Sequence, residues 1–503
     1  MNGSLSGGSR GSVSGQQHFI KFFSYTTKYF WLLVIPLLRS LYSLAFSPDA
    51  LGSWLRGSWL DIIVLLAIIA FAWLRLISVS YSFDGEKIEV RRGIIAVSQD
   101  VVFYSQISTL SLKQGIFYCA LGAVKVYVAT NAGIFDRADI TLVMKKRDAD
   151  RLYLFMKHSR VKSLGYSVSP NKPRLLIFSL LFSSTLSGVL VALAFIMETS
   201  QVFDREAEAK LILDTLSEFA NRLAHIIPPA AAGVSAVILI SWLTSFITNL
   251  FYFWDYIITK TKDSIYIKSG LIAKNRHIIS LERVNYIDLR QSMLAMLLRV
   301  SSLHCHCSGY GSTGRSELSV VLPITPGKEV RSTIREVFPD YPSPELSVKS
   351  SLKALGGFYF WPAAFSLIPL AGYIVCELFM TQWHSVALTA FVIAELPVVW
   401  LAVTKTLSLF ITGVGIKEDH IVLRYLKGYG FHTVIAPIDR VTKVVIRQTV
   451  AQTVNRTCTV IVYTASDSRV KHKIYGIELD RALRLFEGHG FDLYFNESPS
   501  EGW

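Results

Sequence analysis

Long apolar runs alternate with long polar segments along this chain, and the order repeats three times. The apolar runs come in pairs, and most reach the roughly twenty residues that a helix needs to cross a bilayer. Aromatic residues flank several of the runs, as is typical of the headgroup level of a membrane. The pattern predicts three pairs of transmembrane helices, at Phe30 to Phe46 and Trp59 to Val79, Leu175 to Met197 and Ile226 to Trp254, and Phe358 to Met380 and Val386 to Phe410.

One short stretch occurs in all three polar segments. The copies are Gln106–Gln114, Arg283–Gln291 and Arg440–Gln448, and their last residues differ by 291 − 114 = 177 and 448 − 291 = 157. Each copy alternates apolar and polar residues, which is typical of a strand with one buried face, and then reaches a basic residue and Gln. A fixed offset over one supersecondary unit indicates a repeated domain.

The first polar segment predicts the fold of this repeated domain. Asp84-Gly85 precedes an alternating strand, which is a strong hairpin signal. Val124–Val128 and Ile140–Met144 also alternate, and Asp148–Met156 has the spacing of a helix. The other two segments close on an amphipathic helix as well. We therefore expect small α+β modules, each with antiparallel strands and a C-terminal helix that covers an open end of the sheet.

Composition supports a membrane protein rather than a soluble one. Only 17% of the residues are charged and the mean hydropathy is +0.40, whereas about a quarter of the residues of a soluble protein are charged. The net charge of +14 requires an anionic partner. Beside so many apolar runs we expect that partner to be membrane lipid and not nucleic acid. The five cysteines have no framework spacing, which favours a reducing compartment.

Charge also predicts the orientation in the membrane. An even number of crossings between the polar segments places all three on the side of the N-terminus. Net charges are +7 for residues 81–174, +5 for 255–356, +2 for 412–503 and −3 for the loop 198–225. Because positive flanks stay inside, the modules and both termini are predicted to be cytoplasmic. The predicted order is a flexible tail 1–24, helix pair 25–80, module 81–173, helix pair 174–254 with an acidic outer loop 198–225, module 255–356, helix pair 357–411 and module 412–497.

The second copy carries a resemblance to a known family. It reads LERV at 281–284, IDLRQS at 287–292 and LLRVSSLHC at 297–305. This pattern resembles the second class of bacterial pleckstrin-homology-like (PH-like) domains. Three helix pairs with three modules resemble the larger member of a two-protein membrane pair in that family. The family has Gly where the hairpin turns after the Gln; Gly122 matches it, but Arg299 and Arg456 stand there in the other copies.

The resemblance implies a fold and a role. It implies an α+β membrane protein with six transmembrane helices in three pairs, each pair followed by a cytoplasmic PH-like antiparallel β module with a C-terminal helix. It further implies a non-enzymatic protein of the bacterial cytoplasmic membrane that works with a smaller membrane protein carrying one PH-like module. Some members are linked to resistance to antimicrobial peptides. We interpret the chain as a scaffold that displays its modules at the inner face of the membrane.

Basic clusters near the predicted helices are the first candidate site residues. Attraction to anionic headgroups contributes about 1 kcal/mol for each basic residue near the surface. The alternative is a solvated face that merely obeys the charge rule. The candidates for lipid proximity are Arg91, Arg92, Lys145, Lys146, Arg147, Lys274 and Arg276.

Charged residues within or at the ends of the apolar runs are the second group. Intramembrane charge is costly and indicates function by default. The candidates are Arg39, Asp61, Glu377 and Glu395. Glu395 lies deepest, just before Pro397, so it predicts either a structural hydrogen bond between helices or a role in transport. A transporter or exporter component is therefore the alternative function.

His304-Cys305-His306-Cys307 is the one stretch that could suggest a metal site. In a strand the two histidines point to one face and the two cysteines to the other, so the four groups cannot converge without a bulge. We predict strand residues and no metal. The sequence also shows no phosphate loop, nucleophile elbow or HExxH motif, and we predict neither catalytic residues nor a cofactor.

Overall fold

The computed structural model describes residues 12–26, 51–130, 139–160, 166–181, 229–307, 319–379, 384–428, 430–465 and 470–489. The predicted run Phe30 to Phe46, with Arg39, and the acidic loop 198–225 lie outside these residues. The chain forms two compact units. Unit 1 comprises Met1–Val168, Asp255–Arg283 and Cys307–Glu317, and unit 2 comprises Ser169–Trp254, Val284–His306 and Leu318–Trp503.

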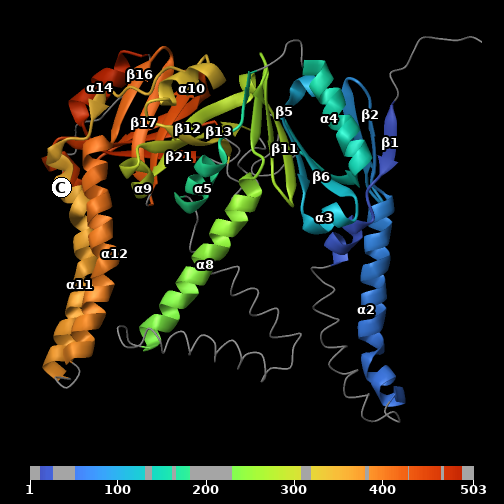
Figure 1. The fold of residues 1–503 in the computed structure, drawn as a ribbon, viewed down its shortest axis with the longest axis horizontal. Coiled ribbons are helices and arrows are strands. Elements are labelled where there is room, and N and C mark those ends of the chain that lie inside the picture. The colour runs from blue at the N-terminus through green and yellow to red at the C-terminus, as the bar shows by residue number, and fades with distance from the viewer. Residues whose placement is uncertain are drawn as a thin grey trace, which may run out of the picture. The chain divides into compact units, whose positions relative to one another are not determined.

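Unit 1 contains two antiparallel sheets (Figure 1). The first has the order β1-β2-β3-β4, and the second has the order β7-β6-β5-β11-β10-β9-β8. The strands are β1 (Val13–Gln16), β2 (Ser80–Phe83), β3 (Lys87–Arg92), β4 (Ser98–Phe103), β5 (Ile107–Gln114), β6 (Ala123–Thr130), β7 (Ile140–Lys145), β8 (Tyr166–Val168), β9 (Ile257–Lys260), β10 (Ser264–Ser269) and β11 (Lys274–Ser280). The helices are α2 (Leu51–Ile77), α3 (Ile116–Ala120) and α4 (Lys146–Arg160).

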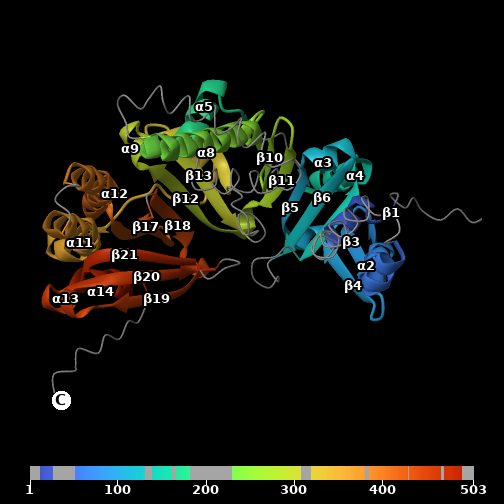
Figure 2. The same cartoon turned by 90° about the horizontal axis from the view of Figure 1, so that it is seen from below.

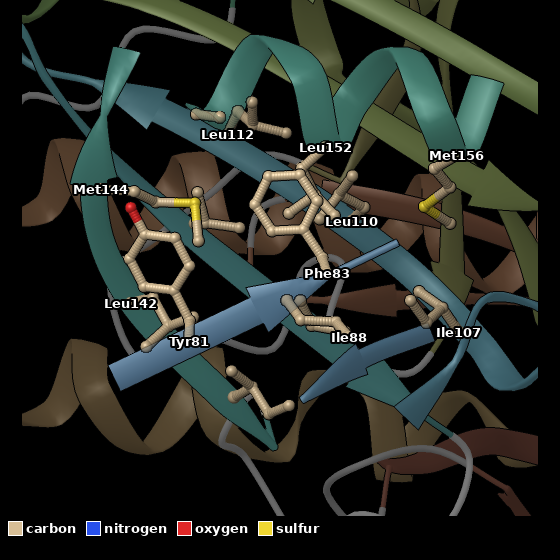
Figure 3. Close-up of a cluster of buried hydrophobic side chains, with 14 of the residues drawn as sticks. Tyr81, Phe83, Ile88, Ile107, Leu110, Leu112, Leu142, Met144, Leu152 and Met156 are labelled. Carbon is tan, nitrogen blue, oxygen red and sulfur yellow. The ribbon is translucent and has the colours of Figure 1, made fainter. Parts of the chain in front are cut away.

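The core of unit 1 lies between its sheets and α4 (Figure 3). Leu110 and Leu142 come from strands of the second sheet, and Phe83 comes from the first. Leu152 and Met156 lie on one face of α4, because residues four apart are neighbours on a helix. Full burial of each such side chain contributes about 1.5–3 kcal/mol. The helix that the sequence predicts at Asp148–Met156 therefore closes this module, as expected.

Unit 2 also contains two antiparallel sheets. Their orders are β14-β13-β12-β18-β17-β16-β15 and β19-β20-β21. The strands are β12 (Val284–Ser292), β13 (Val300–Cys307), β14 (Val320–Pro326), β15 (Val348–Lys349), β16 (Gly413–Lys417), β17 (His420–Lys427), β18 (Gly430–Pro437), β19 (Val441–Arg447), β20 (Thr457–Thr464) and β21 (Val470–Glu478). The helices are α5 (Lys172–Leu181), α8 (Pro229–Phe253), α9 (Met293–Leu297), α10 (Val330–Val337), α11 (Leu355–Phe379), α12 (His384–Ile411), α13 (Val450–Val454) and α14 (Leu479–Glu487).

The repeat predicted from the sequence is a repeat of structure. The elements from β2 to β6 recur from β9 to β13 at an offset of 177 residues, to within two residues at each end. The elements from β9 to β13 recur from β16 to β20 at an offset of 157 residues with the same agreement. Three PH-like β modules are therefore present, as predicted.

The turn that follows α3, α9 and α13 keeps one geometry in all three modules. Gly122 has φ +64°, and Arg299 and Arg456 have φ +53° and +48°. A left-handed conformation costs a residue with a side chain roughly 1–2 kcal/mol. The two arginines therefore tolerate a conformation that Gly122 adopts freely, and the departure from the family pattern has not changed the turn.

The N-terminal segment is not a flexible tail over its described part. Val13–Gln16 forms β1, which pairs with β2, Val13 lying opposite Phe83 and Gln16 opposite Ser80. Residues 20–26 are helical. The prediction of a flexible tail over 1–24 is therefore wrong for these residues. The segment is rich in glycine and serine, so its sequence did not indicate a strand. The strand is stabilised by pairing with the edge of the sheet at β2.

Two of the described helices are long and apolar enough to cross a membrane, Leu352–Phe379 and Ala390–Ile411. Only 6% of the apolar window of each is buried, so neither is the core helix of a soluble domain. Figure 1 shows α11 and α12 side by side as a hairpin. The described parts of α2 and α8 contribute the shorter apolar segments Ile62–Ile77 and Leu239–Phe253. The described helices thus account for two of the six predicted spans by length and composition.

Candidate functional site

Two short strands flank each of the three predicted helix pairs along the chain and pair with each other. β1 lies before the first pair and β2 follows it, and these strands pair in register. β8 and β9 stand in the same relation to the second pair, and β15 and β16 to the third. We call these three strand pairs the clasps. Each clasp brings the chain that enters a helix pair next to the chain that leaves it, at one edge of a sheet.

A basic cleft lies beside the first clasp in unit 1. Its lining includes Lys21, Tyr25, Arg75 and Arg92. The Lys21 ammonium lies 5.4 Å and the Arg75 guanidinium 4.7 Å from the centroid of the Tyr25 ring. Burial, together with the charges of Lys125 and Arg75, lowers the pKa of Lys21 from its ordinary value. Several cations thus share a partly dehydrated space, which is an environment that favours an anion.

The predicted lipid-proximal residues divide into free and engaged groups. Arg92 lines the basic cleft and forms an ion pair with Asp100, and Arg91 lines a neighbouring hollow on the first sheet. Arg276 donates to Asp150 at 2.8 Å and stacks on Tyr153, so its charge is used within unit 1. Arg91 is exposed, as are Lys145, Lys146, Arg147 and Lys274. Nothing in the sequence indicated that Lys21 and Arg75 converge on Tyr25.

Two of the predicted intramembrane acids, Glu395 and Glu377, contact polar groups on the neighbouring helix or at its end. Glu395 on α12 accepts a hydrogen bond of 2.8 Å from Ser366 on α11. Glu377 lies 2.7 Å from His384 at the end of the same hairpin. Asp61 lies in α2. The Ser366 contact is the interhelical hydrogen bond that the sequence offered as one of two roles for Glu395.

A buried polar network lies where β12 and β18 join in unit 2. The Asp288 carboxylate accepts from Arg290 Nε at 2.7 Å and lies 2.9 Å from His432 Nδ1. Arg290 Nη2 lies 2.8 Å from His306 Nε2. Ser319 Oγ lies 3.2 Å from His306 and 3.4 Å from His304, so both histidines of the His304–Cys307 stretch point to one face, as the strand prediction requires.

Burial and charge set the protonation of this network. Burial raises the pKa of Asp288, but the charges of His432 and Arg290 outweigh it and hold that pKa well below its usual range. Burial, followed by the charge of Arg290, lowers the pKa of His306 to about 3, and burial lowers the pKa of His472 to about 4. At neutral pH the Asp288 carboxylate is therefore ionised, and His306 and His472 are neutral.

The network does not have the arrangement of a metal site. Among the residues that the structure describes, no group of three or more His, Cys, Asp or Glu side chains could hold a metal ion. The stacked rings of Tyr286 and His306, with centroids 4.4 Å apart, fill the space beside the histidines. The sequence missed Asp288 and His432 as partners because they lie 144 residues apart. An acid and an Arg two residues apart on one strand was the only local signal.

Comparisons with known proteins match this architecture. A family model described as a bacterial PH domain matches residues 34–160, 211–337 and 364–488. The chain therefore belongs to the bacterial PH domain family. Each match begins within or close to a predicted helix pair and ends at the helix that closes the module, so the family unit contains both parts.

A curated relative agrees with this assignment. The chain is 20% identical over 337 residues to the UPF0699 transmembrane protein YdbT of Bacillus subtilis (strain 168). The match covers 60% of this chain and 66% of that relative, just under two thirds of its length. No solved structure matches the chain.

Proposed function

We propose that this protein is a non-enzymatic scaffold of the bacterial cytoplasmic membrane. Three helix pairs cross the membrane, and the three PH-like modules lie with both termini at the cytoplasmic face. The clasps are the observation that carries this proposal, because a strand before each pair meets a strand after it. A chain that leaves and returns to one sheet edge crosses an even number of times. The relative described as a transmembrane protein and the exposed hairpin of α11 and α12 support a place in the membrane.

Accessibility labelling in intact cells tests this topology. Single cysteines are placed at Ser200 in the acidic loop and at Ser468 in module 3, with exposed Cys119 replaced by Ser. A membrane-impermeant maleimide should label the first position in intact cells and the second only after permeabilisation. Labelling of both positions from outside would overturn the cytoplasmic orientation of the modules.

The basic cleft is the part of the scaffold that we propose to touch anionic lipid. Lys21 lies in the helical residues 20–26, and Arg75 lies in the last turn of α2. In the proposed topology this end of α2 is at the level of the lipid headgroups. Lys21→Glu and Arg75→Glu should weaken binding of the protein, in nanodiscs, to phosphatidylglycerol by several-fold relative to phosphatidylcholine. Lys268→Glu makes the same charge change on an exposed residue of β10 outside the cleft and serves as the control. Equal effects of the three substitutions would mean that only net charge matters.

The scaffold is proposed to work with a smaller membrane protein that carries one PH-like module, and to protect the cell envelope against antimicrobial peptides. Both parts rest on the resemblance to this family. Affinity purification from native membranes tests the first, and peptide sensitivity of a deletion strain tests the second. Recovery of the chain without a homologous protein would remove the partner from the proposal.

Transport is the second candidate, and intramembrane charge such as that of Glu395 motivates it. The hydrogen bond from Ser366 explains the carboxyl group as a contact between helices. Glu395→Gln keeps an acceptor for that bond and removes the charge. We therefore expect unchanged expression and unchanged peptide sensitivity. A loss of resistance at normal protein levels would favour the transport role.

A further inference from the structure

Consecutive modules are joined by strand pairing, and the two joints have the same register. We call the pairing of β5 with β11 joint A and that of β12 with β18 joint B. Leu110 lies opposite Ile278 in joint A, and Ile287 lies opposite Ile435 in joint B. These pairs correspond under the repeat offsets of 177 and 157 residues. One geometric rule therefore joins module 1 to module 2 and module 2 to module 3.

Two strands that correspond to the joint strands have no described partner from another module. β19 is the counterpart of β5 and β12, and β4 is the counterpart of β11 and β18. Each lies at the end of its sheet, so no described strand pairs with its outer edge. Figure 2 shows β19 outermost in its sheet and β4 at the rim of unit 1. Modules 1 and 3 thus each keep one half of a joint without a described partner strand.

Side-chain exposure distinguishes these free halves from the joined strands. Ile278 and Ile435 are 0% exposed, whereas Val101 at the equivalent position of β4 is 42% exposed. Phe103, also on β4, is 47% exposed. Val444 on β19 is half-buried, whereas its counterparts Leu110 and Ile287 are fully buried. Apolar side chains that the inner joints cover are therefore left in the open at both ends.

The two free strands complement each other in charge as well as in pattern. β4 carries Asp100, which also pairs with Arg92 on β3, and β19 carries Lys443 and Arg447. In the register of the inner joints Val445 faces Asp100, which puts Lys443 diagonally across from that acid. Opposite charges on neighbouring strands favour pairing. An apolar edge with these charges is complementary to the other end of the same chain.

We propose that β19 of one copy pairs antiparallel with β4 of a second copy, with Val444 opposite Val101. The interface is a third joint of the kind that the chain already forms twice. Since it uses two different surfaces, it is heterologous and links copies head to tail into a ring or a row. This goes beyond the proposed scaffold function, which needs no self-association. Each inner joint connects modules that follow successive helix pairs, so the same pairing between copies is compatible with one bilayer.

Disulfide formation between two tagged copies tests the register. One copy carries Val101→Cys and the other Val444→Cys, both with Cys119→Ser and Cys376→Ser to remove the less buried native thiols. Directly opposed residues on antiparallel strands have Cα atoms about 4.5–5.5 Å apart, within the range of a disulfide. Mild oxidation in native membranes should give a cross-linked dimer carrying both tags.

The matched control is Val101→Cys with Ile446→Cys. That pair lies two residues out of the proposed register, at a diagonal separation of about 7–8 Å. We expect its dimer yield to be at least several-fold lower. Equal yields from both pairs, or no dimer from either, would overturn the proposed joint. A cross-link from Val444→Cys to a different, smaller protein would show that this protein, and not a second copy of the chain, pairs with β19.

A second variant measures assembly without oxidation. Val101→Asp places a charge where the neighbouring core would lie, yet Val101 is exposed within its own unit and the substitution should not impair folding. Leu154→Asp also introduces an acid at an exposed apolar residue of the same module, and Leu154 lies on α4, outside β4 and the basic cleft. In membrane-derived nanodiscs the unmodified protein and Leu154→Asp should contain several copies, and Val101→Asp only one. A single copy in all three samples would refute the proposal, while leaving the topology experiment unaffected.

Discussion

Joints A and B share a backbone register and differ in the chemistry of their polar side chains. In joint A, His277 on β11 lies opposite Ser111 on β5 and contacts its hydroxyl at 2.8 Å. In joint B, the position equivalent to Ser111 is Asp288, and it holds Arg290 and His432. One joint is closed by a neutral hydrogen bond and the other by an ionic network. The backbone pairing is therefore the same in both joints, whereas the buried polar side-chain contacts differ.

The largest contrast should appear when each joint loses its central polar residue. Asp288→Ala leaves the half-buried Arg290 guanidinium of joint B without its anion, and breaking a buried ion pair costs about 3–5 kcal/mol. Ser111→Ala removes a neutral hydrogen bond and should cost about 1–2 kcal/mol. Amide hydrogen exchange of β12 and β5 in nanodiscs measures both losses. Equal losses at the two joints would mean that solvent reaches the network and reduces the free-energy cost of removing Asp288.

Acid should also destabilise joint B more than joint A. Burial lowers the pKa of His306 to about 3 and of His472 to about 4 in unit 2, and it lowers the pKa of His277 to about 3 in unit 1. Histidine in an unfolded chain titrates near 6.5. Between these values the unfolded state binds more protons, so stability is full above about pH 6.5 and falls as the pH drops.

The expected loss at pH 5 is about 2 kcal/mol for each such histidine. Unit 2 buries more of them, since burial also lowers the pKa of His304. Asp288 does not contribute in this window, because its stabilising contribution is lost only as the pH falls through its depressed pKa. Hydrogen exchange at pH 7.5 and 5, corrected for intrinsic rates, should therefore show a steeper loss in β12 than in β5. A steeper loss in β5 would contradict the assignment of neutral histidines.

A smaller effect, confined to joint A, is expected from the turn that leads into β11. Gly270 has φ +103°, and a Cβ there would lie 1.8 Å from the carbonyl oxygen of Ala273. Gly270→Ala must shift this turn and with it the start of β11, at a cost of about 1–3 kcal/mol. Exchange should rise in β5 and β11 and stay unchanged in β18. Gly356→Ala, at a site where a Cβ meets nothing within 4 Å, is the control.

The smallest effect should come from the turn that all three modules share. Arg299→Gly removes the strain of a left-handed residue but adds entropy to the unfolded chain, so the net gain should stay below about 1 kcal/mol. Gly122→Val introduces a β-branched residue at the matching place in module 1 and should destabilise it instead. Thermal unfolding followed by tryptophan fluorescence can rank the two variants. Destabilisation by Arg299→Gly would show that the Arg side chain contributes more than its strain costs.

The sequence predicted the repeated strands and the closing helices, but it did not predict that strands of consecutive modules pair with each other. Period and offset located the repeat strands, because one face of each strand is apolar whatever lies beside it. The other face of β12 carries Asp288, which an isolated module would expose, yet it is buried. It is covered by β18 of the next module, and nothing local in β12 indicates a partner so far along the chain. The basic cleft was hidden for the same reason, since Lys21 and Arg75 meet only through the packing of two helices.

The clasps also bear on how the protein is made. During synthesis β1, β8 and β15 emerge before the helices that follow them and must wait for β2, β9 and β16. In the proposed topology, a helix pair that inserts with only one crossing leaves the two strands of its clasp on opposite sides of the membrane. The sheet edge then stays open. Under that topology each clasp can form only when both helices of its pair have crossed, so folding of the sheet depends on correct insertion.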